Sequence, residues 1–127
     1  MRKLIESTFV SLDGIISDTN PSTSSRSDPH MWGNKYWDDQ HNAYSAGLVA
    51  GADTLLLGRV TYEGMAEAWS GQSNPFADRV NAMPKYVASR TLTTATWNTT
   101  VIEGDVAEEV AKIKEQPGAN ILKWGTG

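Results

Sequence analysis

The 127-residue chain contains no cysteine. Disulfide bonds, a thiol nucleophile and thiolate metal ligands are therefore excluded from its chemistry. Basic residues are also fewer than acidic ones. The chain has 11 Lys and Arg and 15 Asp and Glu, which gives a formal net charge of −4. No block of basic residues offsets this balance, so we expect no nucleic-acid partner. Any phosphate-binding site must be a local positive feature of an acidic protein.

Long hydrophobic runs are missing as well, and none approaches the length that crosses a membrane. After the basic start, only Leu4 and Ile5 precede Glu6, which is too short for the apolar region of a signal peptide. We therefore expect a cytoplasmic protein with no membrane partner. A hydrophobic content of 39% and a charged content of 20% are typical of a globular protein. The length suits a single domain over residues 1–127.

The segment from Thr54 to Gly64 carries the clearest local pattern. Thr54 to Leu57 is a short apolar run bounded by Asp53 and Gly58, which predicts a buried central strand. After Gly58 the apolar spacing becomes that of one helix face, at i, i+3, i+4 and i+7, on Tyr62, Met65, Ala66 and Trp69. The chain is thus predicted to leave a strand, turn at a glycine and enter a helix.

The turn at Gly58 has the chemistry of an anion site. A helix start presents unpaired N–H groups and the positive end of the helix dipole. Gly58 would let a ligand approach the backbone, Arg59 could grip phosphate oxygens, and Thr61 adds a hydroxyl. An ordinary strand-to-helix turn with a solvated arginine fits the same spacing.

The rest of the chain alternates between strand and helix patterns. No Gly-x-Gly-x-x-Gly fingerprint follows the first strand, so a standard Rossmann dinucleotide domain is not expected. The alternation predicts an α/β fold with a mainly parallel sheet. A polar connection that contains Pro75 is expected over residues 70–82. The predicted strands cover residues 3–10, 85–89, 99–102 and 120–124, and the predicted helices run from Asp38 or Asp39 to about Ala50 and from Asp105 to Pro117.

Four short motifs, in order, resemble one known family. Residues 57–63 (LGRVTYE) resemble a segment of the dihydrofolate reductase-like superfamily, and residues 11–14 (SLDG), 89–92 (SRTL) and 125–127 (GTG) are similar to segments of one branch. That branch contains the C-terminal reductase domain of bifunctional riboflavin-biosynthesis enzymes. The resemblance implies a three-layer α/β/α fold. It also implies a further helix and strands after the terminal glycines, so we expect an incomplete C-terminus and, from open sheet edges, a homodimer or other assembly.

The same resemblance implies NADPH as cofactor. A guanidinium and a hydroxyl at the end of the strand over residues 85–89 suit the 2′-phosphate that distinguishes NADPH from NADH. A solvated strand end is the alternative. The implied cofactor residues are Ile16 near the nicotinamide, Gly58, Arg59, Val60 and Thr61 at phosphate, Ser89 and Arg90 at the 2′-phosphate, and Gly125, Thr126 and Gly127 at the pyrophosphate.

On the substrate side, Asp13 is the acid candidate for handling a proton, with ordered water as the other source. A turn-forming aspartate is the simpler interpretation. Trp37, Asp38 and Tyr62 are the candidates for substrate binding. Aromatic rings can line the pocket of a flat ligand. For Asp38 the resemblance is the reason, because in dihydrofolate reductases an acid in the corresponding helix holds the pterin. Packing beneath a loop is the alternative for the aromatic residues. No metal site is expected, since the two histidines fit no standard ligand spacing.

These observations favour an NADPH-dependent reductase that transfers hydride to a C=N or C=O carbon of a pterin-like or pyrimidine-like small molecule. The cofactor would supply the chemistry and the protein its orientation. The rival hypothesis is a non-catalytic nucleotide-binding or regulatory module with the same fold.

Overall fold

The computed structural model describes residues 1–16 and 33–125. Within them, five parallel strands form one sheet in the order β1-β5-β2-β3-β4. The elements in chain order are β1 (Leu4–Ser7), a 3-10 turn η1 (Asn34–Tyr36), α1 (Asp39–Ala50), β2 (Ala52–Gly58), α2 (Arg59–Trp69), α3 (Pro75–Ala82), β3 (Lys85–Ala88), β4 (Thr99–Ile102), α4 (Val106–Glu115) and β5 (Asn120–Trp124).

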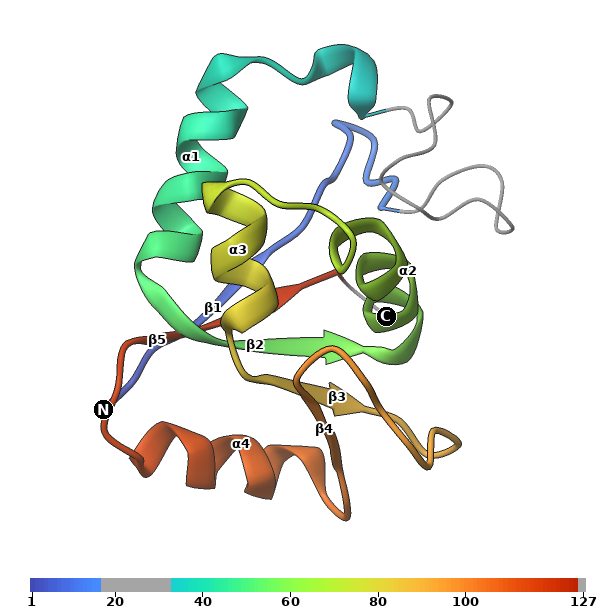
Figure 1. Cartoon of the computed structure of the whole chain (residues 1–127), viewed down its shortest axis with the longest axis vertical. Coiled ribbons are helices and arrows are strands. Elements are labelled where there is room, and N and C mark those ends of the chain that lie inside the picture. The colour runs from blue at the N-terminus through green and yellow to red at the C-terminus, as the bar shows by residue number, and fades with distance from the viewer. Residues whose placement is uncertain (17–32, 126–127) are drawn as a thin grey trace.

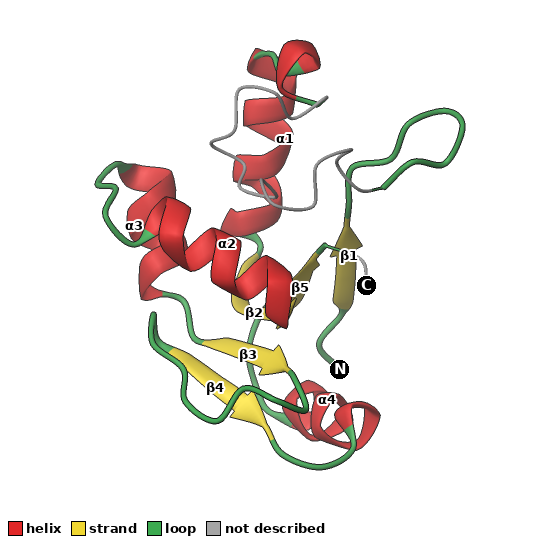
Figure 2. Ribbon diagram, turned by 90° about the vertical axis from the view of Figure 1, so that its right-hand side faces the viewer, coloured by secondary structure: helices red, strands yellow, loops and turns green. Residues whose placement is uncertain are grey.

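The strand order explains why the helices form two layers. The connections from β1 to β2, β2 to β3 and β3 to β4 all step in one direction across the sheet, whereas β4 to β5 steps back. Crossovers between parallel strands are right-handed, so a reversal of direction moves the helix to the other face. Figures 1 and 2 show α1, α2 and α3 on one face and α4 on the other. The predicted three-layer α/β/α architecture is confirmed.

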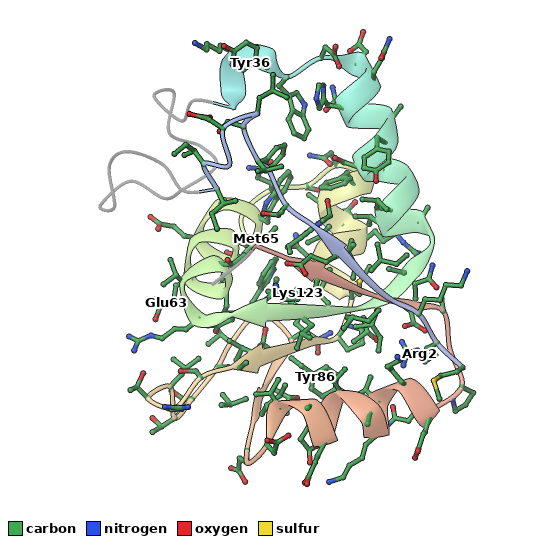
Figure 3. All side chains as sticks on the ribbon, turned by 180° about the vertical axis from the view of Figure 1, so that it is seen from behind. Arg2, Tyr36, Glu63, Met65, Tyr86 and Lys123 are labelled. Carbon is green, nitrogen blue, oxygen red and sulfur yellow. The ribbon has the colours of Figure 1, made fainter. Side chains whose placement is uncertain are left out.

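The central strand β2 divides the core between the two helical layers. Leu55 and Leu57 are almost fully buried on the face covered by α1, α2 and α3. Leu56 points to the other side, where it packs with Ile113 of α4. Tyr86 of β3 also lies between the sheet and α4 (Figure 3). Burial on both faces is why this strand is a continuous apolar run rather than an alternating one.

The prediction of a polar connection over residues 70–82 is wrong for its second half, which forms a helix. Helix α3 begins at Pro75, and the side chain of Asn74 accepts the N–H of Ala77 at 2.9 Å. Asparagine is a favoured N-cap, and proline suits the first helical position because its missing N–H would have no helical partner there. The Asn-Pro pair was therefore a helix signal that the sequence analysis missed.

A buried arginine, Arg2, lies at the amino end of the sheet. Arg2 is 8% exposed and donates hydrogen bonds to the carbonyl of Ala119 (2.7 Å) and the hydroxyl of Thr54 (2.8 Å). It also pairs with Asp53, and Figure 3 shows it beside the end of α4. These contacts tie β2 to the connection between α4 and β5. No helix in the described part of the chain is long and apolar enough to cross a membrane.

Candidate active site at the carboxyl edge of the sheet

The motif segments converge at the carboxyl edge of the sheet. Because all five strands are parallel, their carboxyl ends meet at one edge, which is where open α/β sheets bind ligands. Gly58 at the end of β2 is in register with Ala88 of β3, and Leu57 is in register with Trp124 of β5. The segments that follow these three strands therefore leave the sheet side by side.

Helix α2 begins at this edge without a side-chain cap. Its N-cap is Gly58, in an extended conformation, and among the described residues no side chain caps its first turn. A Cβ built on Gly58 would have no atom within 4 Å, so the space beside this backbone is open. The unpaired N–H groups and the helix dipole favour an anion here.

Arg59 joins two of the motif segments. Its Nε donates to Glu63 Oε1 at 2.9 Å, and its Nη1 donates to Thr91 Oγ1 at 2.5 Å. The Arg59 and Glu63 side chains are about half exposed, and Figure 3 shows Glu63 on the outer side of α2. Exposed ion pairs contribute little to stability, so the guanidinium can exchange its partners for a phosphate at small cost. The arginine connects the start of α2 with the loop after β3.

In that loop, Ser89 shapes the turn and Arg90 points into solvent. The Ser89 hydroxyl oxygen accepts the N–H groups of Leu92 (3.0 Å) and Thr91 (3.3 Å). Arg90 is exposed. Ser89 therefore has a structural role in addition to the cofactor role that the resemblance implies, and its own O–H is still available to donate.

Gly125, directly after β5, contacts the start of α2. Its φ is +75°, a left-handed conformation that favours glycine, and a Cβ there would clash with the hydroxyl of Thr61. This glycine is required by the close approach of the two segments. Val60 is 66% exposed at the same helix start. Thr126 and Gly127, the other two predicted pyrophosphate residues, lie outside the described residues.

Lys123 is a basic residue of this edge that sequence reasoning missed. Its Nζ donates to the carbonyl of Gly125 at 2.6 Å and to Glu6 Oε1 at 2.9 Å, and Figure 3 shows it in the middle of the sheet. Glu6 and Lys123 are register partners on β1 and β5. No local sequence signal marks Lys123, because its position depends on two strands that are distant in the chain.

Asp13 lies in the exposed turn after β1. Its carboxylate accepts the hydroxyl of Ser11 at 2.5 Å. This hydrogen bond, with one from its own backbone N–H, holds the pKa of Asp13 below its ordinary value. Ile16, which ends the first described range, is 52% exposed.

Trp37 lies at a second part of the site, next to helix α1. Its ring packs against Phe9 (centroids 5.6 Å apart) and His41 (5.5 Å). It borders a cavity of about 300 Å³ between α1 and the end of α2. We call this cavity the aromatic pocket; its described lining residues are Trp37, Asn42, Ser45, Trp69, Gln72, Asn74 and Phe76.

The other two predicted substrate residues, Asp38 and Tyr62, have contacts within the protein. Asp38 caps α1, where its carboxylate accepts the backbone N–H of His41 at 2.9 Å and contacts His41 Nδ1 at 2.7 Å. These hydrogen bonds lower the pKa of Asp38. Tyr62 is only 5% exposed, and its hydroxyl accepts the N–H of Thr96 at 2.8 Å. Tyr62 lies on the buried face of α2 and belongs to the hydrophobic core, and its role toward a substrate stays a prediction.

The comparisons with known proteins identify the family of the chain. A search of curated proteins gave no match. The model of the family described as "RibD C-terminal domain" matches residues 2–122, which is nearly the whole chain and includes β1, β2 and α2. That family has a dihydrofolate reductase-like fold, in agreement with the parallel sheet and the two helical layers described above. The chain therefore belongs to the RibD C-terminal domain family, a family of reductase-type domains of riboflavin biosynthesis.

Proposed function

We propose that the protein is an NADPH-dependent reductase that transfers hydride to a C=N or C=O carbon of a pterin-like or pyrimidine-like small molecule. The observation that carries the proposal is the contact between Arg59 and Thr91. It joins the start of α2 to the loop that holds Ser89 and Arg90, so the two segments that we assign to phosphate binding are in contact. Family membership supports the reductase class.

The residues present fit a dinucleotide phosphate. The start of α2 offers N–H groups that no side chain caps, and open space lies beside Gly58. Arg59 and Arg90 add two exposed guanidinium groups to an otherwise acidic protein. A guanidinium binds phosphate oxygens through paired hydrogen bonds. We assign Gly58, Arg59, Val60 and Thr61 to phosphate binding, and Ser89 and Arg90 to the 2′-phosphate.

When bound, NADPH would supply the hydride, and the chain's own residues position it. Gly125 keeps its carbonyl at Lys123 Nζ and its backbone against Thr61, which fixes the turn after β5 beside the helix start. Ile16 is our candidate for the nicotinamide side. Asp13 is our candidate for delivery of the proton, with ordered water as the other source.

The experiment is an NADPH-oxidation assay with pterin and pyrimidine candidates, run beside an NADPH-binding titration. Oxidation that depends on one of these substrates supports the reductase. Binding without oxidation by any candidate would instead support the non-catalytic nucleotide-binding module. Failure to bind NADPH would contradict both assignments.

We also propose that the protein is a cytoplasmic homodimer. Helix α1 supports the dimer, because most of its length is exposed although several residues are small or aromatic. Tyr44 is 68% exposed, and Ala43, Ala46 and Gly47 of the same helix are exposed as well. A surface of this kind permits close approach of a second helix. Sedimentation at several protein concentrations tests the proposal, and a monomer at every concentration would contradict it.

A further inference from the structure

Ser89 and Arg90 belong to a segment without helix or strand, residues 89–98, which connects β3 to β4. We call this segment the β3–β4 loop. Outside a helix or a sheet, the position of a backbone depends on the side chains that contact it. Arg90 is exposed, so the place of its guanidinium depends on how the loop that carries it is held.

The β3–β4 loop ends in a strained turn at Trp97 and Asn98. Both residues have positive φ, +58° and +54°, which is uncommon for residues other than glycine and unfavourable for a bulky one. Such a turn persists only where its surroundings fix it. Trp97 Nε1 donates to Asn81 Oδ1 at 2.7 Å, and Asn98 Nδ2 donates to the carbonyl of Ala82 at 2.9 Å. The end of the loop is therefore held against α3.

One turn of α2 holds two further points of the loop. The hydroxyl oxygen of Tyr62 accepts the backbone N–H of Thr96 at 2.8 Å, and it lies 3.4 Å from the carbonyl oxygen of Thr96. Three residues before Tyr62, Arg59 donates to Thr91 Oγ1. Residues three apart lie on the same side of a helix, so α2 contacts the loop near its beginning and near its end.

These two contacts differ in rigidity. Tyr62 is 5% exposed, and its ring is part of the core that Leu92 and Ala95 of the loop also pack against. Close packing fixes the ring, so the hydroxyl has a fixed position. The Arg59 side chain is about half exposed, and a phosphate can replace Thr91 as its partner. Tyr62 would therefore keep its contact with the loop while Arg59 turns to a cofactor.

We infer, on the basis of the proposed reductase function, that Tyr62 is a positioning residue for cofactor choice. Its hydroxyl holds the β3–β4 loop through Thr96, so that Ser89 and Arg90 are in place before the 2′-phosphate arrives. Groups that must be ordered at the moment of binding reduce affinity, and groups ordered in advance do not. Because the 2′-phosphate distinguishes NADPH from NADH, the hydroxyl of Tyr62 supports the preference for NADPH without contacting the cofactor.

The first experiment uses Tyr62→Phe, which removes the hydroxyl and keeps the ring in the core. Titrations of the full chain at fixed ionic strength give the dissociation constants of NADPH and NADH. NADPH should bind at least fivefold more weakly to the variant, and NADH affinity should change less than twofold, because NADH has no 2′-phosphate. A purely structural defect would weaken both cofactors equally. An unchanged ratio of the two affinities would overturn the inference.

Two further variants are the matched controls. Tyr86→Phe removes a tyrosine hydroxyl from the side of β3 that packs against α4. Thr96→Ala shortens the loop side chain but keeps the backbone N–H that donates to Tyr62. Both should leave the ratio of NADPH to NADH affinity within twofold of the unmodified protein. If Thr96→Ala lowers the ratio as much as Tyr62→Phe does, the backbone contact is not what holds the loop and the inference is wrong.

Amide hydrogen exchange measures the same contact without a cofactor. The Thr96 amide should be protected in the unmodified protein, and Tyr62→Phe should accelerate its exchange at least tenfold. The amides of Leu55 and Leu57 in β2 should keep their protection in the variant. A Thr96 amide that exchanges as fast as an unstructured peptide in the unmodified protein would overturn the inference, whether or not the variant folds.

The binding data separate failure of the inference from failure of the proposed function. If the unmodified protein binds neither cofactor, both fail, even where the Thr96 amide is protected. If it prefers NADPH and a folded Tyr62→Phe variant retains the full preference, the inference fails alone. Equal affinities of the unmodified protein for NADPH and NADH would also overturn the inference, because there would be no preference to support. Thermal unfolding establishes that each variant is folded.

Discussion

The hydroxyl of Thr61 occupies the space that a side chain at Gly125 would need. Thr61 belongs to the first turn of α2 and Gly125 follows β5, so the contact joins two motif segments that have α3, β3, β4 and α4 between them in the chain. With φ at +75°, residue 125 is also in a conformation that side chains rarely adopt.

Gly125→Ala should therefore be destabilising by about 1–3 kcal/mol, from the unfavourable backbone conformation and from the clash with Thr61. Urea unfolding gives the free energy. In the double variant Gly125→Ala with Thr61→Ala, the clash is removed and the backbone strain stays, so part of the loss should return. Strictly additive effects of the two substitutions would show that the residues do not contact each other.

Arg59→Ala should weaken NADPH binding by about 1–3 kcal/mol, the usual range for the loss of charge-assisted hydrogen bonds. Its effect on unfolding should be below about 1 kcal/mol, because the ion pair with Glu63 is exposed. A titration at fixed ionic strength measures the affinity. Lys112→Ala is the matched control, since it removes an exposed basic group from α4 on the other face of the sheet. Equal affinities of the two variants would exclude Arg59 from the phosphate site.

Cofactor choice tests Ser89 and Arg90. NADPH should bind more tightly than NADH, and added salt should narrow the difference, because exposed charges are screened. Arg90→Ala should reduce the preference about tenfold, which corresponds to one charge-assisted hydrogen bond of about 1.4 kcal/mol. Identical affinities for the two cofactors in the unmodified protein would show that this loop is only a solvated strand end.

The buried Lys85 should make the free energy of unfolding increase at alkaline pH. It is 1% exposed, its Nζ donates to the carbonyl of Met83 at 2.7 Å, and it lies 4.2 Å from the ring centroid of Trp97. Burial lowers the pKa of Lys85 from 10.5 to about 8. Between these two pH values the unfolded chain binds more protons than the folded one, so the free energy of unfolding should increase with pH.

Urea unfolding at several pH values from about 7 to about 10 measures this dependence. The variant Lys85→Met removes the ionisable group and keeps much of the side-chain volume, so its free energy of unfolding should lack the rise. The other ionisable groups titrate equally in the unmodified protein and in Lys85→Met. Their contributions therefore cancel in the difference between the two free energies of unfolding. Parallel curves for the two proteins would show that Lys85 keeps its ordinary pKa in the folded state.

The sequence alone determined the elements that depend on local chemistry. The apolar run before Gly58 identified β2, the i, i+3, i+4, i+7 spacing identified α2, and Asp38 and Asp105 marked the starts of α1 and α4. Caps and periodicity act within a few residues of the chain, so they can be read without a tertiary structure. The four motifs in order were also sufficient to predict the family, which the match over residues 2–122 confirms.

Only the tertiary structure decided which of these residues meet. The contacts of Arg59 with Thr91, of Thr61 with Gly125 and of Lys123 with Glu6 each join segments that are distant in sequence. Strand order and register produce them, and neither is encoded by a local pattern. The same reason explains the burial of Tyr62, because the packing of α2 on the sheet places its side chain in the core. Spacing predicts a helix face, and the fold decides what that face contacts.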